Sequence, residues 1–140
     1  MLILLTLAVA AAVQPGPARW THTAPVAHGS GQVTATYIAR PVVATRQIGT
    51  SMGSRMSTER CVWTAEIGVE RQLGDGSRAL ASTKTFKGSR HGSCAINRDA
   101  IDREIAAKAP EINAHLVAVA EHDQRELRSE IKTLTPPAGR

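Results

Sequence analysis

The segment ERCVWTAEIGVERQL, residues 59–73, decides the fold because it holds the clearest periodicity in the chain. Apolar side chains fall on every second position of this segment; they are Cys61, Trp63, Ala65, Ile67 and Val69. A period of two with one apolar face is typical of a strand that buries one side of an antiparallel sheet. The segment therefore predicts a half-buried strand.

The residues that follow predict that the chain turns back on itself. GDGS, residues 74–77, supplies glycines that tolerate positive φ, and RALASTKTFK, residues 78–87, follows as the second arm of a hairpin. Apolar and polar residues alternate only weakly in this arm. The sequence therefore leaves open which of its faces turns toward the core.

The residues before the strand carry weaker signals. VTATYIARPVVATRQI, residues 33–48, is rich in β-branched side chains, but Pro41 cannot donate to a strand ladder. This stretch therefore predicts either two strands or one edge strand that bends at Pro41. Residues 13–32 are rich in proline and glycine, and they predict an extended lead-in without regular structure.

A change of period marks the C-terminal part of the chain. Apolar residues recur every three or four positions along one helical face, at Ile101, Ile105, Ala109, Ile112, Leu116 and Val119. We expect Asn97 to cap the start of this helical region, and Pro110 either to kink one helix or to begin a second. The sequence thus predicts a single α+β domain over residues 33–140, with strands in 33–87 and helix in 97–134.

The predicted fold is a small antiparallel sheet of three or four strands, built around the central hairpin and packed against this long C-terminal helix. Near the end of the helix the apolar stripe narrows to Leu127, Ile131 and Leu134. Such a stripe is closer to the seam of a coiled coil than to the broad face that packs on a sheet. The three residues are therefore a candidate seam for a partner helix or a homodimer, and the alternative is a helix end that frays.

The first residues of the chain are expected to lie outside the folded domain. LILLTLAVAAAV, residues 2–13, is uninterrupted and apolar, yet a helix of this length spans roughly 18 Å, short of the ~30 Å core of a bilayer. Its length and its small residues at Ala8, Ala10 and Ala12 are typical of a secretory signal peptide, although no Lys or Arg precedes the run. We expect a signal peptide over residues 1–12 and a periplasmic or secreted protein.

The expected export bears on the chemical state of the two cysteines, Cys61 and Cys94, because an exported protein meets an oxidising compartment. A hairpin brings the start of its first arm close to the end of its second, which is where these two residues stand. A disulfide closing this loop is worth roughly 3.8 kcal/mol in the chain-entropy model. The alternatives are a catalytic thiol, and a zinc site with His91 that lacks the usual C-x₂-C pairing. The oxidising compartment favours the disulfide.

The charge is unevenly distributed. The chain carries a net charge of +5, and the excess of basic residues lies before His91. Within FKGSRHGS, residues 86–93, the cations Lys87, Arg90 and His91 stand among small residues and are a candidate anion-binding loop. The ordinary interpretation of this segment is a solvated loop. The ordinary interpretation of the basic excess is that GC-rich DNA encodes many arginines.

These features favour a small exported protein, not an enzyme, that binds or supports an anionic polymer or lipid of the cell envelope. One alternative is a small hydrolase or metal-binding enzyme built on the loops 49–58 and 88–93, since GTSMG matches G-x-S-x-G with Ser51 as nucleophile. The other is an interaction module that acts through the terminal helix. Few aromatic residues and export argue against nucleic acid, and nothing in the sequence predicts a cofactor or a metal.

Overall fold

The computed structural model describes residues 18–28, 31–50 and 58–134, without the side chains of His28 and residues 131–134. Within these ranges the chain forms β1 Trp20–His28, β2 Gly31–Ile48, β3 Arg60–Leu73, β4 Gly76–His91, α1 Cys94–Ala106 and α2 Ala109–Leu134. The predicted α+β fold, with a small antiparallel sheet and a C-terminal helical region, is confirmed. The expected signal peptide, residues 1–12, lies outside the described residues.

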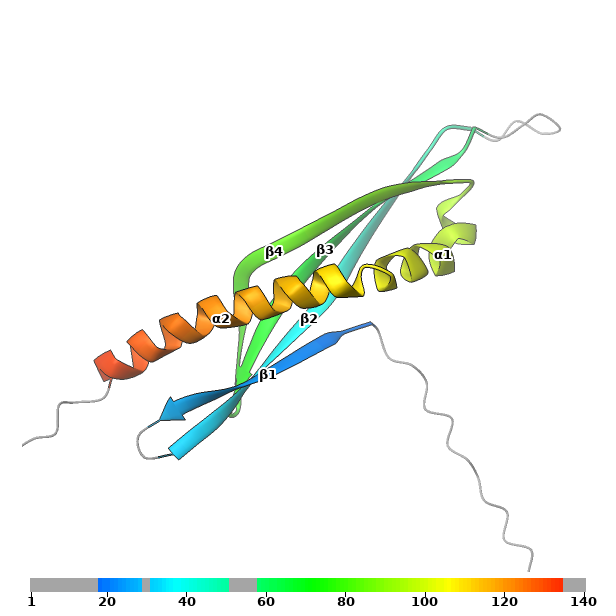
Figure 1. The fold of residues 1–140 in the computed structure, drawn as a ribbon. Helices are drawn as coiled ribbons and strands as arrows, with labels where there is room; N and C mark the ends of the chain where they lie inside the picture. The colour runs from blue at the N-terminus through cyan, green and yellow to red at the C-terminus, as the bar shows by residue number, and fades with distance from the viewer. Residues whose placement is uncertain (1–17, 29–30, 51–57, 135–140) are drawn as a thin grey trace, which may run out of the picture.

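The four strands form one antiparallel sheet in the order β1-β2-β3-β4, so each strand pairs with its neighbour in the sequence. The expected central hairpin is β3 and β4, in which Leu73 pairs with Gly76 across the turn. Gly74 begins this turn at φ +58°, a conformation that glycine adopts without a steric penalty. Figure 1 shows both helices running across the same side of the sheet.

The first strand corrects the prediction for residues 13–32, which were expected to lack regular structure. Trp20–His28 is the strand β1, and Ala24 and Val26 on its inner face are buried. Pro25 is exposed within it and lies opposite Thr34 of β2. Because β1 is at the edge of the sheet, a residue without an N–H is tolerated there, and proline was therefore a poor guide to this segment.

The second strand runs through Pro41 without ending. β2 pairs with β3 along Ala35–Ile48, but β1 reaches only as far as Ala39. Pro41 therefore lies just past the point where β2 becomes an edge strand, which reconciles the proline with a continuous strand. Of the two predicted arrangements, one long strand is the one found.

The last strand is longer than expected. β4 continues to His91, so residues 88–91 are strand and only the end of the predicted loop 88–93 is irregular. The inner face of β4 carries its even-numbered residues, since Phe86 is buried and Gly88 lies against the ring of Trp63. A Cβ at Gly88 would approach that ring to 2.5 Å, so the packing of the Trp63 ring over β4 requires glycine.

The core lies between the inner face of the sheet and the two helices. The alternating residues of β3 predicted to face inward are all buried, and so are the apolar residues that line α1 and α2. From the helices they are Ile101, Ile105, Ile112, Leu116, Val119, Ala120 and Leu127. The helical face predicted from the sequence is therefore the face that covers the sheet.

The helical region is divided in two. α1 ends at Ala106 and α2 begins at Ala109, with Pro110 in its first turn, where a missing N–H costs little. The expected cap at Asn97 is wrong, because the side chain of Ser93 accepts from the N–H of Ile96 and caps α1. Asn97 is instead buried inside the helix, where its Nδ2 donates to the backbone oxygens of His91 and Ser93.

Candidate functional site

The two cysteines form a bond and are not a reactive site. Cys61, near the start of β3, is joined to Cys94, the first residue of α1, with Cα atoms 4.8 Å apart. The predicted disulfide is thus confirmed. It removes both thiols from the catalytic and zinc-binding alternatives. Among the described residues, no group of three His, Cys, Asp or Glu side chains is placed to hold a metal ion.

The three candidate anion-binding residues do not come together. Lys87 and His91 are exposed on the outer face of β4, away from the helices, whereas Arg90 points to the inner face. There its Nε donates to Asn97 at 3.1 Å and its guanidinium pairs with Glu104 at 2.5 Å. Arg90 therefore ties β4 to α1 instead of facing a ligand.

Other basic residues of the sheet are also divided between its inner and outer faces. Arg71 and Arg78 turn to the helix side and pair with acids of α2, while Arg60 lies on the outer face. The outer face is covered by no described residue, because both helices lie on the opposite side (Figure 1). A cation on this face can meet a partner in solution unless it pairs on the face itself, as Arg40 does with Glu70.

One end of this outer face gathers four basic side chains, which we call the basic end: Arg46, Arg60, Lys87 and His91. Arg60 lies directly opposite His91, Arg46 shares the next row with Ser89, and Lys87 lies one row further along. Neighbouring side chains on one face of a sheet stand about 5 Å apart across strands, so the four basic side chains cover a compact patch. No acid faces outward in these three rows of the described sheet.

The basic end is held in a defined geometry by its neighbours. The Arg60 guanidinium donates to Ser89 Oγ at 2.8 Å, which orients it across β3 and β4. The remaining outward residues of these rows are Ile48, Val62, Ala44 and Thr64, of which none carries charge. Arg46 was not predicted, because the interrupted pattern of β2 gives no sign of the face on which it lies.

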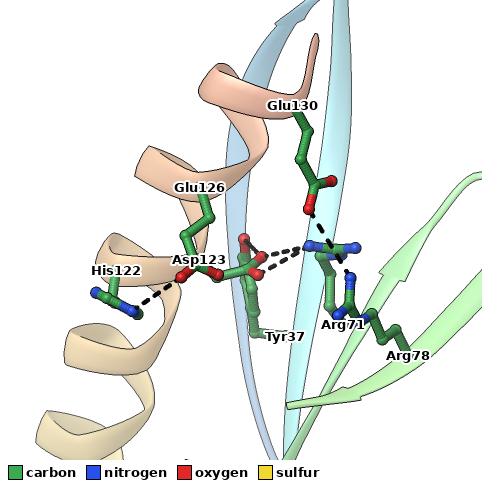
Figure 2. A network of polar contacts seen from close by, with 7 residues as sticks. All are labelled: Tyr37, Arg71, Arg78, His122, Asp123, Glu126 and Glu130. Atoms are coloured by element: carbon green, nitrogen blue, oxygen red, sulfur yellow. Dashed lines mark hydrogen bonds and ion pairs between the residues drawn. The ribbon is translucent and has the colours of Figure 1, made fainter. Parts of the chain in front are cut away.

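A second polar cluster lies between α2 and the sheet (Figure 2). Asp123 is 4% exposed, and its two carboxylate oxygens accept from the Arg71 guanidinium at 2.8 and 3.0 Å and from the Tyr37 hydroxyl at 2.8 Å. Burial, followed by the hydrogen bond to Asp123, raises the pKa of Tyr37 well above its ordinary value. The tyrosine therefore stays protonated, and the cluster joins β2, β3 and α2 as a structural link.

A groove lies between β4 and α2, lined by Leu80, Ser82, His115, His122 and Glu126. The Nε2 atom of His115 is buried there without a hydrogen-bond partner. Burial, followed by the nearby Lys84 cation, lowers the pKa of His115, and a hydrogen bond with the backbone of Ser82 only partly opposes this. His115 is therefore neutral at pH 7, and His122 pairs with Glu126 at the rim (Figure 2).

Acidification is expected to weaken the fold through His115. The pKa of His115 in the folded chain lies below the unfolded value of 6.5. The contribution of His115 to the free energy of unfolding is therefore complete above pH 6.5, and it is lost as the pH falls through the folded pKa. The thermal midpoint measured from pH 7.5 down to 4.5 should fall less steeply in His115→Gln than in the wild type. The control, His122→Gln, changes an exposed histidine of the same helix, and an equal flattening in this variant would contradict the assignment.

The remaining candidates lie partly outside the described residues. Ser51, the nucleophile of the hydrolase alternative, lies outside the described residues. The side chains of Ile131 and Leu134 lie outside them as well. Leu127 is 4% exposed and belongs to the core between α2 and the sheet. A partner seam at the end of α2 therefore stays a prediction that depends on Ile131 and Leu134.

Comparisons of the chain with protein-family models, with curated proteins and with solved structures found no match. Within the described residues, neither helix combines the length and the apolar composition that crossing a membrane requires. The class that the fold and the site define is a small disulfide-bonded α+β domain in which no described helix covers the outer face of the sheet.

Proposed function

We propose that this protein is exported and binds an anionic polymer of the cell envelope through the basic end of its open sheet face. The observation that carries the proposal is the set Arg46, Arg60, Lys87 and His91, which projects from three strands without an outward-facing acid in the same rows. A surface of one sign attracts anions over about a Debye length, roughly 8–10 Å at physiological salt.

The form of the face suits a polymer better than a small molecule. The basic end spans three strands, so its basic side chains can meet successive charges of a polymer. Small and β-branched residues stand between the cations, and no aromatic side chain is available there to enter a lipid layer. Both points favour a soluble anionic polymer over a membrane surface.

Export is supported by two independent features. The disulfide between Cys61 and Cys94 is typical of an oxidising compartment, since thiols are kept reduced in the cytosol. The apolar run at the start of the chain has the length and the small residues of a cleavable signal. An envelope polymer is then the anion that the protein would meet.

Binding is tested with dextran sulfate as the probe. Changing Arg46 and Lys87 to Ser should weaken binding about tenfold, because each exposed ion pair contributes up to about 1 kcal/mol. The affinity of the wild type should also fall steeply between low and high salt. Isothermal titration or fluorescence anisotropy with labelled polymer measures both effects.

The matched control removes the same charge from the other side of the molecule. Arg125→Ser with Arg128→Ser changes two exposed arginines of α2 and should leave the affinity within about twofold of the wild type, since long-range attraction is screened. Equal losses in the two double variants would mean that net charge alone binds the polymer. Binding to phosphatidylglycerol vesicles but not to dextran sulfate would replace the polymer by a lipid surface.

A further inference from the structure

Part of β2 is an unpaired strand edge. β1 begins opposite Ala39, so the segment of β2 from Arg40 to Ile48, which we call the open edge, pairs only with β3 among the described residues. A strand edge presents a row of unpaired N–H and C=O groups, and such a row readily accepts another strand. The open edge is thus a place where a further strand fits.

The turn of the hairpin fixes which backbone groups point outward. Leu73 and Gly76 flank a two-residue turn and therefore exchange hydrogen bonds with each other. Backbone groups alternate in direction along a strand, and the register between β2 and β3 is continuous, so odd-numbered residues of β2 face away from β3. Val43, Thr45 and Gln47 therefore direct their N–H and C=O groups to the open edge.

The same alternation explains a proline and predicts where another would be tolerated. Pro41 is odd-numbered, so its missing N–H falls on the open edge and leaves the ladder with β3 intact. A proline at Thr45 would remove an outward N–H in the same way. This provides a variant that blocks the edge without removing a hydrogen bond of the sheet.

Exposed apolar side chains concentrate along this edge. Of the six large hydrophobic residues exposed among the described residues, three belong to it: Val42 at 71%, Val43 at 38% and Ile48 at 41%. A groove beside α1, lined by Val43, Thr45 and Ile101, lies along the same segment. Solvated edges are usually protected by charge and proline. This edge carries Arg46 and Pro41, but the three exposed apolar residues beside them still favour a surface that a partner covers.

We propose that a second copy of this chain covers the open edge, with the two β2 strands pairing antiparallel about a two-fold axis at Thr45. Two-fold pairing is the commonest way in which identical chains associate. Thr45 then faces Thr45 of the second copy, and their outward backbone groups form a hydrogen-bonded pair. The product is one continuous sheet of eight strands, twice the four of a single chain.

The side chains favour this register. Val42 faces Ile48 of the second copy, so the most exposed apolar residue of the edge is paired with another one. Arg46 faces Ala44, so no like charges stand directly opposite each other. A two-fold axis at Val43 would instead place Arg40 against Arg46, and like charges opposed across strands are destabilising. The groove itself carries both signs, since Arg98 and Asp102 line it together.

The pairing does not depend on the proposed polymer binding, but it would bring the two basic ends together. Arg46 of one copy and Arg46 of the other become diagonal neighbours on the outer face, where their repulsion is relieved by salt. Association should therefore strengthen as salt rises, which is the reverse of the salt dependence expected for polymer binding. The two proposals can thus fail separately.

The test is the mass in solution of the disulfide-bonded protein, by light scattering and sedimentation up to about 100 μM, where association of roughly 5.5 kcal/mol or more is detected. We expect a dimer for the wild type and a monomer for Thr45→Pro, with thermal midpoints that agree when both proteins are diluted until the wild type is also monomeric. Val42→Lys, a change at an exposed side chain, should weaken association at least tenfold without relying on proline. The control, Val33→Lys, alters an exposed valine (39%) in the half of β2 that pairs with β1 and should remain dimeric.

Three results would overturn the proposal. A wild-type monomer at the highest concentration would remove the second copy as the occupant. A dimer that persists in both Thr45→Pro and Val42→Lys would place the interface elsewhere, with the end of α2 as the next candidate. A monomer that dimerises only after deletion of residues 13–17 would assign the open edge to the protein's own N-terminal segment.

Discussion

Replacing Asp123 with alanine is expected to lower the free energy of unfolding by about 3–5 kcal/mol, and the thermal midpoint by roughly 10 °C or more. The side chains of Arg71 and Asp123 are 11% and 6% exposed. Without the carboxylate, the guanidinium is left buried and unpaired, and the Tyr37 hydroxyl loses its acceptor. Urea unfolding and differential scanning calorimetry measure the loss.

A second ion pair of the same helix provides the control. Glu130 and Arg78 lie 3.9 Å apart with 53% and 66% of their side chains exposed, so Glu130→Ala should cost less than about 1 kcal/mol. The double variant Asp123→Leu with Arg71→Met removes both charges and should recover much of the loss, because the penalty comes from the charge left alone. Similar midpoints for Asp123→Ala and Glu130→Ala would contradict the role assigned to the cluster.

Loss of the disulfide is expected to cost roughly 3.8 kcal/mol of the free energy of unfolding. The bond fixes the first residue of α1 to β3, and that end of α1 is otherwise held by its Ser93 cap and by Asn97. The double variant Cys61→Ser with Cys94→Ser should therefore have a lower urea midpoint than the wild type. Wild-type protein treated with dithiothreitol should show the same lowered midpoint. Intact mass of wild-type protein from the envelope fraction checks that the bond is present and that the signal peptide has been removed.

The double serine variant is its own control, because dithiothreitol should leave it unchanged. A wild-type midpoint that does not respond to the reductant would mean that the bond contributes nothing to stability. A full-length cytoplasmic product with two free thiols would remove the basis for export.

The parts of the fold that the sequence predicted are those in which one residue pattern follows one periodicity. Cys61 to Val69 alternate because β3 is central and buried on one face, and Ile101 to Val119 follow a helical face because the helices cover that sheet. The disulfide followed from the hairpin that begins with β3, because the two ends of a hairpin lie close together. Each of these predictions needed only neighbours in the sequence or the closure of one hairpin.

The features that the sequence did not predict depend on contacts between residues that are distant in the sequence, and local patterns do not reveal such contacts. β1 was missed because an edge strand admits Pro25, which elsewhere signals a loop. Lys87, Arg90 and His91 were grouped as a loop, but a strand sends neighbouring residues to opposite faces, so Arg90 separated from the other two. The buried cluster of Asp123 was not predicted, because its partners Arg71 and Tyr37 lie 52 and 86 positions away.

The order of the elements along the chain has a consequence for the timing of folding. β1 is the first described element and α2 the last, yet α2 packs more closely on β1 than on any other strand. The sheet itself joins only neighbouring strands, so it can pair progressively while the chain is being synthesised. The part of its inner face that α2 covers, however, stays exposed until this final helix emerges, although α1 already covers another part. Nascent chains that stop before Ala109 should therefore be handled as unfolded protein, although all four strands are already present.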